Sequence, residues 1–81
     1  MYVFTIHSVS DPAAFWAGRL ELPEGTELPM VVPSADGSRG VCLFTSDSLE
    51  TVRGVVDGAT SAVSRNEFYA INESGAQGLP G

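Results

Sequence analysis

The chain has 81 residues, with ten acidic and four basic side chains, so its formal net charge is −6 at pH 7. This acidity argues against nucleic acid or an anionic membrane as a partner, and the absence of lysine excludes Schiff-base chemistry on a lysine amine. One cysteine cannot form an internal disulfide, and no apolar stretch approaches the roughly 20 residues that span a bilayer. The first residues lack the positive flank of a signal peptide, so we expect a cytoplasmic protein.

Four short apolar runs predict four strands, with one helical segment between the first two strands and another between the last two. The runs cover residues 2–6, 28–32, 41–44 and 68–71. None of them alternates cleanly between apolar and polar residues, which predicts that both faces of the sheet need cover. Two helices can cover only one face, and a second copy of the chain is the simplest cover for the other.

The first strand is expected to run from Tyr2 to about Ser8. Ser10-Asp11-Pro12 then supplies a helix N-cap followed by a proline suited to the first helical turn. The helix is predicted over residues 13–20 and is short, because Pro23 and Gly25 follow soon after it.

Pro29 and Pro33 bracket the second predicted strand. Proline donates no ladder hydrogen bond, so this strand belongs at an edge of the sheet. Asp36-Gly37 is typical of a hairpin turn, after which the third strand is predicted at Arg39–Thr45.

Asp47 and Glu50 have the spacing of a capping box, with Asp47 as the N-cap of the second helix. Gly54 and Gly58 are expected to weaken or end that helix. Its apolar residues recur at helical intervals and would form one face against the sheet: Leu49, Val52, Val55, Val56 and Ala59. The fourth strand is predicted over residues 66–72.

This order predicts an α+β, β-α-β-β-α-β sandwich with an antiparallel sheet in the ferredoxin-like order 4-1-3-2. We expect one domain over residues 1–73 and a glycine-rich tail over residues 74–81. The same pattern predicts a homodimer joined through the open face of the sheet.

His7 and Cys42 are the residues with the most chemical potential. His7, the only histidine, is a candidate general acid or base and a candidate metal ligand, the alternative being a packed, hydrogen-bonded side chain. Cys42 lies in an apolar strand, where free cysteine usually acts as a small hydrophobe. The two strands would be adjacent, so these residues are also a candidate pair of metal ligands, although they supply only half of a tetrahedral site.

Aromatic residues suggest a small apolar pocket between helix and sheet. We expect Trp16 and Phe44 to line it and His7, Asn66 and Tyr69 to orient a ligand in it. The alternative is that the aromatic side chains simply fill the core.

Several short motifs resemble the dimeric α/β-barrel superfamily. They are Thr5-Ile6-His7-Ser8-Val9-Ser10-Asp11, Phe15-Trp16, Gly40-Val41-Cys42-Leu43-Phe44, Ser46-Asp47-Ser48 leading into Val52-Arg53, and Asn66-Glu67-Phe68-Tyr69. The resemblance covers most of residues 2–72. It implies ferredoxin-like protomers that dimerise, as in cofactor-free monooxygenases of the antibiotic-biosynthesis type.

The strand with Cys42 and the helix after it are also similar to a small nickel-binding group of that superfamily. This likeness implies a divalent metal such as nickel at His7 and Cys42.

Three functions therefore follow as hypotheses. The first is a dimeric protein that binds a small apolar ligand or a metal ion. The second is a cofactor-free monooxygenase or isomerase in which His7 is the base and Tyr69 or Asn66 holds an oxyanion. The third is a structural or regulatory dimer.

Overall fold

The computed structural model describes residues 1–18 and 20–80 and contains four strands and two helices among them. In chain order they are β1 (Tyr2–Val9), α1 (Pro12–Ala17), β2 (Glu27–Pro33), β3 (Arg39–Thr45), α2 (Leu49–Thr60) and β4 (Ser64–Ala70). Every strand pairs antiparallel to its neighbours, and the sheet order is β2-β3-β1-β4. Read from the other edge this is 4-1-3-2, so the predicted α+β topology is confirmed.

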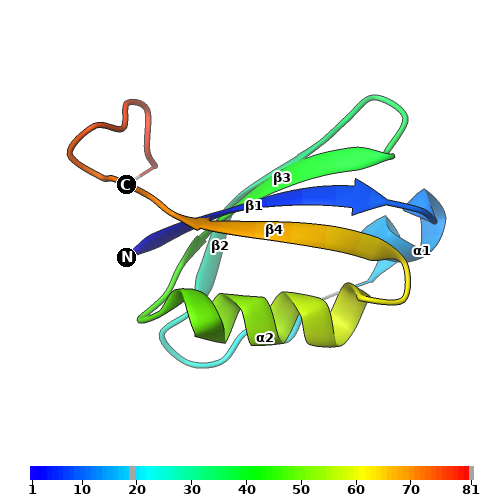
Figure 1. Ribbon diagram of the computed structural model, residues 1–81, viewed down its shortest axis with the longest axis horizontal. Helices are drawn as coiled ribbons and strands as arrows, with labels where there is room; N and C mark the ends of the chain where they lie inside the picture. The colour runs from blue at the N-terminus through cyan, green and yellow to red at the C-terminus, as the bar shows by residue number, and fades with distance from the viewer. Residues whose placement is uncertain (19, 81) are drawn as a thin grey trace.

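The two faces of the sheet differ in what covers them. α2 runs along one face, and α1 lies at the end of the sheet where β1 finishes (Figure 1). We call the face with these helices the inner face and the opposite face the outer face. On β1 the odd-numbered residues belong to the inner face and are buried: Val3, Thr5, His7 and Val9.

The core lies between α2 and the inner face. It is a small cluster of buried side chains from β1, β3 and α2, namely Val3, Cys42, Phe44, Val52 and Val56. Partly buried leucines from the α1–β2 connection and from β2 extend this cluster. Because the core is small, each buried side chain accounts for a large share of the stability of the fold.

α1 is shorter than predicted. Asp11 caps it by accepting the Ala14 backbone N–H at 3.2 Å, and Pro12 occupies the first turn, as expected. The helix ends at Ala17, where Gly18 takes an extended conformation, and not at Leu20. Arg19, which the predicted helix included, lies outside the described residues.

The N-cap of α2 lies one residue later in the chain than predicted. The N-cap is Ser48, whose hydroxyl accepts the Thr51 N–H at 3.1 Å, and not Asp47. The helix also continues through Gly54 and Gly58 to Thr60, because the face that contains the buried Val52 and Val56 packs against the sheet. Tertiary packing therefore outweighs the low helix propensity of glycine.

β4 starts two residues earlier than predicted and ends at Ala70. The β2–β3 hairpin turns at Asp36-Gly37 as expected, with Gly37 at φ 76°. After β4 the chain folds back toward the start of β1, where the Tyr2 hydroxyl donates to the carbonyl of Pro80. Figure 1 shows the N-terminus and the C-terminal segment at the same end of the sheet. No helix among the described residues is long and apolar enough to cross a membrane.

Candidate functional site

A pocket of about 490 Å³ lies between α1, α2 and the inner face of the sheet. We call it the helix-side pocket. Its walls are mostly apolar, and the larger side chains come from α1, the α1–β2 connection and β2: Phe15, Trp16, Leu20, Leu22, Leu28 and Val31. Three polar or titratable side chains join them, namely His7, Cys42 and Thr60.

The short first helix closes one end of this pocket with Trp16. The Trp16 indole N–H donates to the Gly37 carbonyl at 2.8 Å, which ties α1 to the β2–β3 hairpin. The ring also covers Gly40, the residue opposite His7 in the strand register. A side chain at position 40 would occupy the same space as the indole, so glycine at this position permits the arrangement.

His7 is the central polar group of the pocket. Its side chain is only 2% exposed and lies against Phe15, with the two ring centroids 5.0 Å apart. Burial lowers the pKa of His7 from its ordinary 6.5, although the hydrogen bond to Asn66 opposes this effect. The imidazole is therefore neutral at pH 7.

Asn66 holds His7 in place from β4. Its side-chain oxygen lies 2.7 Å from Nδ1 of His7, and its amide nitrogen donates to Asp57 and Thr60 on α2. The Asn66 side chain thus connects β1, β4 and α2. It orients the histidine, and both N–H donors of its amide are bonded to α2, so no donor remains for a ligand in the pocket.

Cys42 shares the inner face with His7 but is not directly opposite it. The strand register pairs Cys42 with Thr5 and His7 with Gly40, so the two are diagonal neighbours. Burial raises the pKa of the Cys42 thiol to about 11, which keeps it protonated at neutral pH. Cys42 is therefore a poor nucleophile and contributes apolar surface to the pocket.

The donor set for a divalent metal is incomplete. His7 and Cys42 line the same pocket, but no group of three or more His, Cys, Asp or Glu residues within ligating reach exists among residues 1–18 and 20–80. A structural zinc or nickel site of this kind needs further protein ligands, and the thiol would also have to lose its proton. The described residues of one chain do not fit such a metal.

Three of the four sequence-predicted ligand residues do not line the pocket: Phe44, Asn66 and Tyr69. Asn66 acts on the pocket only through its hydrogen bond to His7. Phe44 is fully buried in the core. Tyr69 pairs with Phe4 on the outer face and is 50% exposed, on the other side of the sheet from His7. The partner of Tyr69, Phe4, is three positions from His7 on β1, and residues an odd number of positions apart on one strand point to opposite faces. Tyr69 therefore cannot hold an oxyanion next to His7.

The partners that organise the site were not predicted from the sequence. Asp57 and Thr60 on α2 bond to Asn66, and Gly40 makes room for Trp16. Asp57 and Thr60 are polar residues three apart in an otherwise apolar helix segment, and this spacing is the one signal that pointed to a shared contact.

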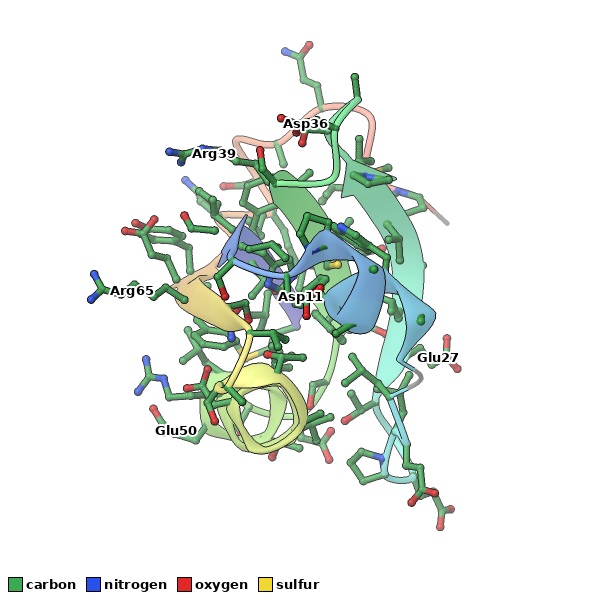
Figure 2. The ribbon with its side chains drawn as sticks, turned by 90° about the vertical axis from the view of Figure 1, so that its right-hand side faces the viewer. Asp11, Glu27, Asp36, Arg39, Glu50 and Arg65 are labelled. Carbon is green, nitrogen blue, oxygen red and sulfur yellow. The ribbon has the colours of Figure 1, made fainter. Side chains whose placement is uncertain are left out.

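A second hollow, of about 550 Å³, lies beside the C-terminal end of β1. It is lined mainly by serines together with Arg39 and Arg65, and Figure 2 shows both arginine side chains projecting on the same side of the molecule. This hollow is open and polar and contains none of the predicted site residues. A third hollow, of about 910 Å³, is also open and polar and contains only Asn66 among the predicted site residues. The helix-side pocket is therefore the candidate functional site. Comparison of the chain with protein-family models, curated proteins and solved structures finds no significant match.

Proposed function

We propose that this protein binds a small apolar or aromatic molecule in the helix-side pocket. The observation that carries the proposal is the pocket itself: about 490 Å³ of mostly apolar space with one neutral, oriented histidine in its wall. Ligand sites of small molecules commonly have volumes of roughly 300–1,000 Å³ and a few fixed polar groups. An organic ligand is favoured over a metal ion because His7 and Cys42 lack a third donor among the described residues.

We further propose that the protein acts as a homodimer joined through the outer face of the sheet. Large apolar side chains that are exposed or half-buried gather there, from all four strands: Phe4, Ile6, Met30, Val32, Val41 and Tyr69. Met30 and Val32 are 39% and 47% exposed, and no described helix covers them. A patch of this kind on a soluble chain is typical of an interface, and a self-complementary face suits a two-fold dimer.

The binding proposal is tested with thermal unfolding and equilibrium dialysis against apolar naphthalene derivatives. Ala59→Phe would fill the pocket from α2, whereas Ala62→Phe adds the same ring outside it. We expect ligand to raise the melting temperature of the native protein and of Ala62→Phe but not of Ala59→Phe. Equal effects in all three proteins would contradict the pocket as the binding site.

Light scattering and elemental analysis of the freshly purified protein test the remaining parts of the proposal. A metal-free dimer agrees with it. Stoichiometric nickel, zinc or copper would instead favour the metal-binding hypothesis, with ligands contributed by His7, Cys42 and a second copy. A dimer to which no probe and no metal binds would leave a structural or regulatory dimer as the function.

A second candidate is a base-catalysed reaction such as isomerisation or cofactor-free oxygenation. The neutral imidazole of His7 favours it, because a neutral buried histidine can remove a proton from a bound substrate. It ranks second because Tyr69 lies on the outer face and the Asn66 amide is bonded to α2. Faster deuterium exchange at the acidic C–H of 2-indanone with the native protein than with His7→Phe would support this candidate.

A further inference from the structure

The orientation of Asn66 is fixed by a group that can only accept hydrogen bonds. The Asp57 carboxylate lies 2.9 Å from the Asn66 Nδ2 atom, and the Thr60 hydroxyl, which itself donates to the Val56 carbonyl, lies 3.0 Å from it. A carboxylate has no proton to give, so the amide nitrogen of Asn66 must face α2. The amide oxygen therefore faces β1.

That oxygen in turn fixes the tautomer of His7. The Oδ1 atom of Asn66 lies 2.7 Å from the His7 Nδ1 atom and also accepts the Ser64 hydroxyl at 3.0 Å. An amide oxygen only accepts, so Nδ1 of His7 carries the proton. In a neutral imidazole the other nitrogen, Nε2, is then a bare acceptor, and no described residue forms a hydrogen bond with it.

We propose that the helix-side pocket selects a neutral molecule that presents one hydrogen-bond donor, a hydroxyl or an N–H group, to Nε2 of His7. This rests on the proposed function, since it assigns the chemical class of the ligand of the same pocket. An ether of the same shape has no proton for Nε2, and a carboxylate would bring its own lone pairs against it. Through Asn66, the negative charge of Asp57 on α2 thereby determines that His7 on β1 prefers a ligand with a hydrogen-bond donor.

Three matched probes test this selectivity by equilibrium dialysis at pH 7.5: 2-naphthol, 2-methoxynaphthalene and 2-naphthoate. They share one ring system and differ in carrying a donor, no donor or an anionic acceptor. We expect 2-naphthol to bind about three- to tenfold more tightly than the ether, the range that one net hydrogen bond supplies. 2-Naphthoate should bind most weakly.

His7→Phe is the informative variant, because it keeps a ring of similar size and removes the acceptor. It should bind the naphthol and the ether equally well. Asn66→Asp combined with Asp57→Asn places a carboxylate beside Nδ1 and an amide donor in place of the carboxylate 2.9 Å from it, which favours the imidazolium, so Nε2 gains a proton and the preference should turn toward 2-naphthoate.

Nitrogen-15 NMR of the native protein tests the tautomer without any substitution, and the single histidine makes the assignment unambiguous. We expect a protonated Nδ1 and an unprotonated Nε2 whose signal shifts when 2-naphthol binds. A proton on Nε2, or equal affinity for 2-naphthol and 2-methoxynaphthalene, would overturn the assigned ligand class while leaving the proposed pocket intact. Failure of all three probes to bind would overturn the proposed function as well.

Discussion

Trp16 lies directly over Gly40. A Cβ atom added to Gly40 would be 2.5 Å from Cη2 of the indole and 2.6 Å from Cζ2, distances that real side chains do not tolerate. The indole N–H also donates to Gly37 in the same hairpin, so a ring from a six-residue helix is fixed at two points. Through this contact the β2–β3 hairpin determines where α1 sits and how one end of the helix-side pocket closes.

Gly40→Ala should displace Trp16 and destabilise the protein. The added methyl group has backbone on one side and the indole on the other, and overpacking of this kind costs about 1–3 kcal/mol. A shift of the fluorescence emission of Trp16, the only tryptophan, and a lower melting temperature would report the change. Gly54→Ala is the control, because its Cβ meets nothing within 4 Å, and it should stabilise α2 by about 1 kcal/mol. Unchanged fluorescence in Gly40→Ala would contradict the described packing.

Val31 and Val32 are neighbours on β2 with the same 47% exposure but on opposite faces. Val32→Arg puts a charge on the outer face and should shift the proposed dimer toward monomer. Val31→Arg puts the same charge at the helix-side pocket, and should weaken binding of naphthalene probes without changing the molecular mass in solution. Light scattering and equilibrium dialysis on both variants measure this. The dimer proposal fails if the two variants have the same mass in solution.

The Thr5 hydroxyl is fully buried and has no hydrogen-bond partner among the described residues. Thr5→Val replaces it with a methyl group of similar size, so we expect a gain of about 1 kcal/mol in the free energy of unfolding. In a domain of this size that is about 4–8 °C in melting temperature.

Thr26→Val is the matched control for Thr5→Val. Its hydroxyl is buried too, but it shares a 2.9 Å hydrogen bond with Ser46, so this variant should lose about 1–2 kcal/mol. A loss of stability in Thr5→Val would mean that its hydroxyl has a partner, such as a bound water.

Acidification should destabilise the protein through His7. Burial lowers the pKa of His7 in the folded state below the ordinary 6.5 of the unfolded chain, so the unfolded state takes up the proton first. The contribution of His7 is therefore fully present above about pH 6.5 and falls as the pH drops toward the lower, folded-state pKa. Urea unfolding at several pH values should show this component in the native protein and not in His7→Phe. An identical pH dependence in both would indicate a solvated histidine.

Ser48→Ala should weaken α2 more than Asp47→Ala. The Ser48 hydroxyl caps the helix and also bonds the Thr51 hydroxyl at 2.8 Å, and loss of an N-cap costs about 1 kcal/mol. Asp47 makes no comparable contact with the helix. Chemical denaturation measures both changes, and a larger loss for Asp47→Ala would restore the predicted capping box.

Residues close together in the chain carried most of the fold information. Asp11 and Pro12 start α1, Asp36-Gly37 turns the hairpin, and the prolines of β2 place it at an edge, as predicted. These signals depend on the backbone preferences of one to four neighbouring residues, so they can be recognised without knowledge of the tertiary contacts. The predicted N-cap of α2 was wrong by one residue, because Asp47 and Ser48 are both good N-cap residues and only tertiary packing decides between them.

The candidate site was visible only in part. His7 and Trp16 were recognised from their residue types, and both line the helix-side pocket. Grouping Tyr69 with His7 was wrong, because the strand register pairs Tyr69 with Phe4, on the opposite face of β1 from His7. A shift of one residue in register moves a side chain to the other face of a sheet.

By itself, the sequence determined the order of strands and helices, the net negative charge, and the single histidine as the candidate functional group. Only the tertiary structure decided that Asp57 orients the amide of Asn66 and that the amide oxygen of Asn66 accepts a hydrogen bond from Nδ1 of His7. The physical reason is distance along the chain. His7 and Asn66 are 59 residues apart, and hydrogen bonds between such residues exist only after strand register and helix packing have brought three elements together.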